Sequence, residues 1–138
     1  MWWPGDSRTW TEAHNSPGTT TTGVAWAVGD GEVATTPVAK ATYYLVANPG
    51  GTAATVKVTL LFEDGSAVQT RTFTVGANSR FGVSVGDEFP AAAGRRFGAL
   101  IESLGPSPAP IVVERAMYGD AGADVWAAGS NVLATRLR

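Results

Sequence analysis

Side chains suited to sugar binding are concentrated in the first 15 residues of the chain. Trp2, Trp3 and Trp10 lie in a segment rich in Gly, Pro and Ser. The flat apolar face of an indole suits the C–H face of a pyranose, and neighbouring polar groups can bind the sugar hydroxyls. These residues are therefore candidates for a carbohydrate platform, although packing of the rings on the sheet as a lid, or on a neighbouring copy, is the simpler interpretation. The polar residues available to such a platform are Asp6, Arg8, Glu12, His14 and Asn15.

Catalytic chemistry has weak support in the sequence. His14 is the single histidine, and no serine lies in a G-x-S-x-G pattern. One histidine does not build a usual zinc site, so we expect His14 to be structural. Glu102 and Glu114 lie on consecutive predicted strands and could face each other as a glycosidase pair. Ion pairs with Arg71 or Arg115 are the simpler interpretation, and we expect a protein that is not an enzyme.

Three acidic turns offer oxygen ligands, and we expect no cofactor from them. None follows the D-x-[DN]-x-[DN]-G pattern of a calcium loop. An Asp-Gly pair is also ordinary hairpin-turn chemistry, so calcium remains an unsupported alternative. The acidic residues concerned are Asp30, Glu32, Asp64, Asp87 and Glu88.

Charge and hydropathy argue against two classes of partner. The net charge is −2, and the ten Lys and Arg are scattered rather than gathered into the basic face that nucleic-acid binding requires. No apolar run approaches the roughly 18 residues that span a bilayer. Met1 is not followed by the basic region of a signal peptide. The absence of cysteine excludes disulfides and leaves the redox compartment open.

Short alternating segments predict an all-β protein. Val56, Val58, Leu60 and Phe62 alternate with polar residues, which is the period of a half-buried strand. Similar segments at 23–33, 41–48, 79–85, 97–104, 111–118 and 125–137 give about eight strands at short spacing. The stretch 86–96 is a loop with one helical turn at 91–93, and the Pro-spaced stretch 105–110 is a connection. We expect an antiparallel β-sandwich, with a closed barrel as the alternative.

Asp64-Gly65 marks the turn of the clearest hairpin, and two loop lengths compete there. A three-residue loop at 63–65 places Leu60 opposite Val68, whereas a two-residue loop at 64–65 places Leu60 opposite Gln69. Pairing apolar with apolar favours the three-residue loop. That choice leaves two apolar residues of the second strand on the polar face, Phe73 and Val75.

The two ends of the chain resemble each other at an offset of 116 residues. Met1 matches Met117, Trp10 matches Trp126 and Asn15 matches Asn131, with Trp2 aligned to Tyr118 and Thr19 to Thr135. One interpretation is two unrelated aromatic edge strands. The other is a tandem-repeat protein in which Met1 is an internal methionine and residues 1–22 are the tail of a preceding copy or a cover for an edge strand. Residues 23–138 would then form the β-sandwich module.

Several stretches carry a resemblance to a known kind of module. The run "TYYLVANPGGTAATVKVTLLFEDG", then "SRFGVSV", then "IVVERAMY", together with the opening "MWWPG" and "WTEAHNSPG", resembles a repeated module of large secreted or surface bacterial proteins. That family is of unknown function and contributes no catalytic residues. The resemblance implies an Ig-like sandwich, an extracellular or cell-surface location, and neighbouring copies as partners. With the tryptophans, it makes a polysaccharide-binding or adhesion module the expected function, and a structural spacer the alternative.

Overall fold

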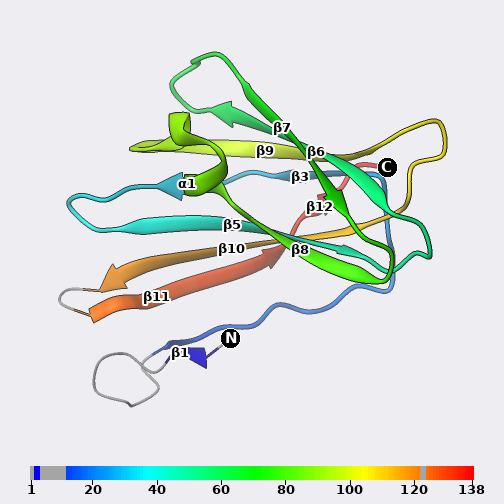
Figure 1. Ribbon diagram of the computed structural model, residues 1–138. Coiled ribbons are helices and arrows are strands. Elements are labelled where there is room, and N and C mark those ends of the chain that lie inside the picture. The colour runs from blue at the N-terminus through cyan, green and yellow to red at the C-terminus, as the bar shows by residue number, and fades with distance from the viewer. Residues whose placement is uncertain (1, 4–11, 122–123) are drawn as a thin grey trace.

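The chain folds into two antiparallel sheets that face each other as a β-sandwich (Figure 1). The computed structural model describes residues 2–3, 12–121 and 124–138, with side chains described for 14–120 and 128–138. One sheet has the strand order β11-β10-β5-β8. Its strands are β5 (Lys40–Asn48), β8 (Ser79–Ser84), β10 (Val112–Ala121) and β11 (Asp124–Leu133).

The second sheet has six strands in the order β12-β3-β9-β6-β7, with β4 also paired to β9. These strands are β3 (Ala25–Val28), β4 (Glu32–Val33), β6 (Ala54–Phe62), β7 (Gln69–Val75), β9 (Arg95–Leu104) and β12 (Thr135–Arg136). The prediction of an antiparallel β-sandwich is therefore confirmed. The two sheets contain ten strands: the turn expected at 29–31 separates β3 from β4, and the segment 125–137, expected to give one or two strands, gives β11 and β12.

The core lies between the sheets, where alternate residues of each long strand point inward. On β6 the buried residues are Ala54, Val56, Val58, Leu60 and Phe62, as the period of two predicts. Trp26 of β3 is 1% exposed, and its indole Nε1 donates to the Gly23 carbonyl at 3.3 Å. Full burial of each large apolar side chain stabilises the fold by roughly 1.5–3 kcal/mol. Trp26 is thus a core residue, as expected, whereas the Trp126 side chain lies outside the described residues.

The predicted register of the β6–β7 hairpin is wrong. Leu60 pairs with Gln69 rather than Val68, and the pairing continues to Val56 with Phe73 and Ala54 with Val75. This register buries Val75 to 1% exposure and packs Phe73 against the core, whereas Val68 is 54% exposed. The apolar residues far from the turn therefore decide the register, because they have a facing sheet to pack against.

The segment after this hairpin differs from its prediction in two details. Val83 and Val85 are buried as expected, but Phe81 is 37% exposed and its ring lies 5.6 Å from that of Phe73. The chain turns into the short helix α1 (Val85–Glu88) directly after β8, and a 3₁₀ helix follows at Pro90–Ala92. The expected helical turn in this loop is confirmed one residue earlier than predicted.

A small separate sheet precedes the sandwich. β1 (Trp2–Trp3) pairs with β2 (Glu12–Ala13), and β2 contacts β11. From β2 the chain runs along the side of the four-stranded sheet that carries β11, and then enters the six-stranded sheet (Figure 1). We call residues 14–16 the strap, because they lie across β10 and β11.

Candidate functional site

A pocket of about 410 Å³ lies on the outer face of the four-stranded sheet, which is the face turned away from the six-stranded sheet. Alternation along the strands places its residues there, since Glu114 on β10 pairs with Leu45 on β5, and Leu45 pairs with Gly82 on β8. The strap supplies one wall. The lining residues are His14, Leu45, Arg80, Glu114, Ala116 and Asn131.

A hydrogen-bonded network holds the strap to this face. Asn131 Nδ2 donates to Glu114 Oε1 at 2.7 Å and to Ser16 Oγ at 3.0 Å. Ser16 Oγ also donates to Glu114 Oε1. Among the described residues, the buried Asn131 Oδ1 has no hydrogen-bond partner.

Two tyrosine rings pack next to the strap on the same face of the sheet. The His14 ring lies 5.7 Å from the Tyr118 ring at a tilt of 53°, and the Tyr43 ring meets Tyr118 edge-on at 5.8 Å. Burial raises the pKa of the Tyr118 phenol above its ordinary value; Tyr43 and Glu114 raise it further, and Arg80 opposes them. Tyr118 therefore stays protonated at neutral pH and presents an apolar ring beside a mixed polar wall.

Gly129 on β11 makes room for the strap. A Cβ at this position would lie 2.8 Å from His14 Cε1, 2.9 Å from His14 Nδ1 and 3.2 Å from the Met117 carbonyl oxygen. Separations under 3 Å are closer than a carbon atom tolerates, so the His14 ring could not keep its position. Glycine at 129 is thus what allows His14 to lie flat on the sheet beside Tyr118.

The residues predicted for the carbohydrate platform are only partly tested by this geometry. Asp6, Arg8 and Trp10 lie outside the described residues. Trp2, Trp3 and Glu12 belong to β1 and β2 by their backbones, and their side chains lie outside the described ones. His14 lines the outer-face pocket, whereas Asn15 points to solvent.

Two polar residues of this pocket, Arg80 and Asn131, were not predicted, and neither were the two tyrosines packed beside His14, Tyr43 and Tyr118. Tyr43 and Arg80 come from β5 and β8, which pair with each other across more than 30 residues of chain. Asn131 carried a signal in the sequence, because it is the partner of Asn15 in the repeated phrase.

The predicted carboxylate pair does not exist. Glu102 lies on β9 of the six-stranded sheet, and Glu114 lies on β10 of the four-stranded sheet. Each points to the outer face of its own sheet, because Glu102 forms an ion pair with Lys57 at 2.7 Å and Glu114 binds the strap. Consecutive strands of a sandwich often belong to different sheets, and the alternation pattern does not reveal this.

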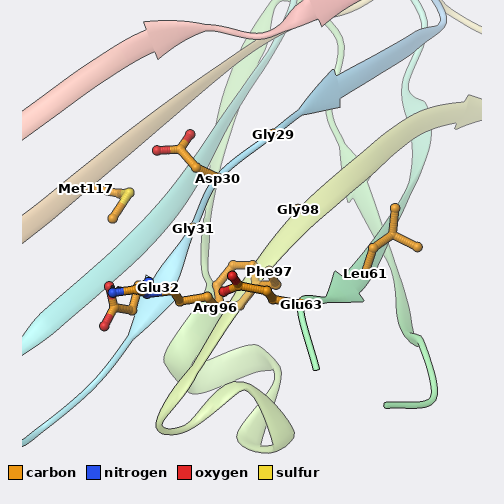
Figure 2. Close-up of a pocket in the computed structure, with 10 residues that line it drawn as sticks. All are labelled: Gly29, Asp30, Gly31, Glu32, Leu61, Glu63, Arg96, Phe97, Gly98 and Met117. Atoms are coloured by element: carbon orange, nitrogen blue, oxygen red, sulfur yellow. Dashed lines mark ion pairs between the residues drawn. The ribbon is translucent and has the colours of Figure 1, made fainter. Parts of the chain in front are cut away.

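A second pocket of about 560 Å³ lies at the end of the sandwich (Figure 2). It is formed by the β3–β4 turn, the start of β9, and the end of β6 with the first residue of the loop that follows. The lining residues are Gly29, Asp30, Gly31, Glu32, Leu61, Glu63, Arg96, Phe97, Gly98 and Met117. Figure 2 shows Glu32 beside Arg96, and their charged atoms lie 3.5 Å apart. The one aromatic ring of its lining, Phe97, is 2% exposed and therefore offers no open face to a ligand.

Four of the five acidic turn residues face cationic side chains or hydrogen-bond donors. Asp30 lies 3.2 Å from the guanidinium of Arg115, which is itself 6% exposed and turned into the core. Glu32 contacts Lys40 at 2.7 Å, and Glu88 contacts Arg71 at 2.8 Å. Donation from the Ser66 hydroxyl and backbone N–H lowers the pKa of Asp64.

Within residues 2–3, 12–121 and 124–138, no group of three His, Cys, Asp or Glu side chains has a geometry that could hold a metal ion. The same residues contain no helix of the length and hydropathy needed to cross a bilayer.

Comparison with known proteins gives a fold match alone. No protein-family model and no curated protein matches the chain. The crystal structure of Thermotoga maritima 1070 matches with a TM-score of 0.68 and 14% identity, covering 85% of this chain and 97% of that one. The Anabaena sensory rhodopsin transducer matches with a TM-score of 0.57 and 23% identity, covering 71% of this chain and 91% of that one. At these identities the matches establish a shared sandwich architecture and no shared activity.

Proposed function

We propose that this protein is a non-catalytic binding module whose outer-face pocket takes a neutral saccharide. The observation that carries this is the mixture of groups around that pocket. Arg80 can only donate hydrogen bonds, the Glu114 carboxylate oxygens act as acceptors, and both residues line the same face of the sheet. Sugar hydroxyls donate and accept at once, so they satisfy such a mixed set.

The charges of the pocket favour a neutral ligand. Arg80 and Glu114 carry opposite charges on either side of β5, so an anion would be repelled by Glu114 and a cation by Arg80. Leu45 and Ala116 supply an apolar floor, and the Tyr118 ring lies beside it. A pyranose has one apolar face and a polar rim, which matches this arrangement.

The end pocket of Figure 2 suits a saccharide less well. Two of its three carboxylates are already engaged, Asp30 with Arg115 and Glu32 with Lys40 and Arg96. Its aromatic ring is buried, so a sugar would have no ring to stack on. The pocket volume of about 410 Å³ on the outer face lies in the range of small-ligand sites.

The cellular location is proposed from the resemblance to modules of secreted and surface proteins. The same resemblance supports the proposal that the sandwich is Ig-like. An extracellular or cell-surface location, with polysaccharide as partner, fits a saccharide-binding module. A structural spacer is the second candidate. It is favoured by the pairing of β1 with β2, which matches the pairing of β10 with β11 at an offset of 116 residues.

A panel of soluble neutral oligosaccharides tests the proposal through tryptophan fluorescence and thermal unfolding. At ten times its dissociation constant, a ligand that binds only the folded state adds about 1.4 kcal/mol. For a chain of this length that raises the melting temperature by roughly 4–6 °C. Arg80→Ala should abolish the shift, and Arg96→Ala, which alters the end pocket, should leave it intact.

Three outcomes would reject the proposal. A panel that moves neither fluorescence nor melting temperature removes the saccharide. A shift that Arg96→Ala abolishes and Arg80→Ala preserves places the ligand in the end pocket instead. A zwitterionic amino acid that binds where the sugars do not would show that Arg80 and Glu114 recognise charges rather than hydroxyls.

A further inference from the structure

The small sheet at the N-terminus repeats the geometry of the β10–β11 hairpin. Trp2 pairs with Ala13 and Trp3 with Glu12. The residues 116 positions later pair in the same way, Tyr118 with Gly129 and Gly119 with Ala128. The identities at this offset, such as Met1 with Met117 and Asn15 with Asn131, flank the paired residues, so the sequence and the strand pairing give one alignment of the two segments.

The exposure of side chains continues the equivalence beyond the hairpin. In the strap, His14 and Ser16 turn toward the sheet and Asn15 turns to solvent. Their equivalents on β11 have the same parity, because successive side chains of an extended chain point to opposite sides. Ser130 and Val132, equivalent to His14 and Ser16, are exposed, and Asn131 lies under the strap.

β11 therefore has one side covered and one side open. Gly129 and Asn131 contact the strap from the outer face, whereas Ser130 and Val132 lie on the inner side. There Ser130 Oγ accepts a hydrogen bond from Arg115 at 2.8 Å, and Val132 is 42% exposed. β11 is the edge strand of its sheet, so its outward edge is also available. The open side carries the residues whose equivalents in the strap bind this same sheet.

We infer that the outer face of the four-stranded sheet is a docking surface for the β11 strand of a second copy of this module. In that contact Ser130 and Val132 of one copy take the places that His14 and Ser16 occupy here. When the two copies are joined at the observed offset, residues 117–138 of the first serve as residues 1–22 of the second, so no linker is needed. In this arrangement β11 of the first copy stays in its own four-stranded sheet and also packs on the outer face of the four-stranded sheet of the second copy.

The receiving side of this contact is already formed in the structure. Gly129 provides the gap that a strap side chain fills, and Asn131 keeps its bond to Glu114 when Val132 replaces Ser16. Val132 can neither donate to Glu114 nor accept from Asn131 as Ser16 does, so the docked strand forms two hydrogen bonds fewer than the strap. In the single chain the strap therefore holds the surface, and docking becomes visible only when the preceding copy supplies the strand.

A two-copy chain tests this inference, with Arg138 of the first copy followed directly by Gly23 of the second. The sequence has no cysteine, so an engineered pair has one possible disulfide within each chain. Val132→Cys in the first copy and Asn131→Cys in the second should form a disulfide in oxidising buffer. The control pair replaces the second cysteine by Thr72→Cys, which lies on the six-stranded sheet and should not link.

A positive control in the single chain keeps the test decisive. Ser16→Cys with Asn131→Cys should link, because Ser16 Oγ and Asn131 Nδ2 lie 3.0 Å apart. If this pair links while the Val132–Asn131 pair of the two-copy chain does not, the inference is overturned. Equal linking of the Thr72 control also overturns it. Saccharide binding does not enter this readout, so the outcome is independent of the proposed function.

Discussion

Replacing Gly129 by alanine perturbs the strap at one defined contact. The new Cβ would approach the His14 ring to 2.8 Å, and that ring is the movable partner because it ends a flexible side chain. The ring must leave its place beside Tyr118, and the strap loses the anchor that positions Ser16 over Glu114.

The magnitude follows from the contacts that are lost. An aromatic pair contributes about 0.5–1.5 kcal/mol, and each neutral hydrogen bond about 0.5–1.5 kcal/mol. Against this, alanine in a strand is more favourable than glycine by roughly 0.5–1 kcal/mol. We expect Gly129→Ala to lower the free energy of unfolding by about 1–2 kcal/mol. In a His14→Ala background the same change should be neutral or stabilising, because nothing then opposes the new methyl group except the Met117 carbonyl.

Urea unfolding of the four proteins of this double-mutant cycle measures the coupling energy, which should be about 2 kcal/mol. Gly119→Ala is a matched control on β10, since its Cβ would meet the Ala39 carbonyl at an ordinary 3.4 Å. The control should leave stability unchanged or raise it by up to about 1 kcal/mol. A coupling energy of zero within about 0.3 kcal/mol would refute the seating of His14 on Gly129.

Three further predictions concern the core and its buried polar groups. Tyr44→Phe removes a fully buried hydroxyl that has no hydrogen-bond partner among the described residues, so stability should rise by roughly 1 kcal/mol in thermal or urea unfolding. Burial raises the pKa of Tyr44, so the folded protein keeps a phenolic proton that the unfolded chain releases near pH 10. The free energy of unfolding should therefore keep its full value below that pH and decrease above it. The decrease should be smaller in Tyr44→Phe. Val75→Ala should cost about 2 kcal/mol and Val68→Ala less than about 0.5 kcal/mol, and the reverse order would contradict the hairpin register. Asp30→Ala leaves the Arg115 guanidinium buried without its ion-pair partner and should lower the free energy of unfolding by roughly 3 kcal/mol. Arg115→Met leaves Asp30, which is 66% exposed, in contact with water and should lower it by less than about 1 kcal/mol. Equal losses of stability in the two variants would contradict this asymmetry.

Local patterns were sufficient to predict the long strands of the sandwich, but not the short strands β1 and β2. The alternation on β6 and β5 predicts which side chains enter the core, and the Asn-Pro-Gly-Gly turn after Asn48 ends β5 as expected. The β6–β7 register was not predictable from the turn, because Val68 beside the turn has no facing sheet to bury it. Val75 at the far end does, and only the arrangement of the two sheets reveals that difference.

The outer-face site needed knowledge of the sheet order. Arg80, Leu45 and Glu114 become neighbours because β5 lies between β8 and β10. These pairings join residues more than 30 positions apart, and nothing in the local sequence specifies them. His14 was identifiable as a lone histidine in a polar segment, but its position over Gly129 depends on the repeated hairpin.

A ¹H–¹⁵N NMR titration with the saccharide that gives the largest thermal shift tests the proposed binding site most directly. Amides of the outer face should move in a saturable way, at residues 43–47, 80–82, 114–118 and 129–131, and those lining the end pocket of Figure 2 should stay in place. Shifts confined to residues 29–32, 61–63 and 96–98, or no saturable shift with any saccharide, would contradict it.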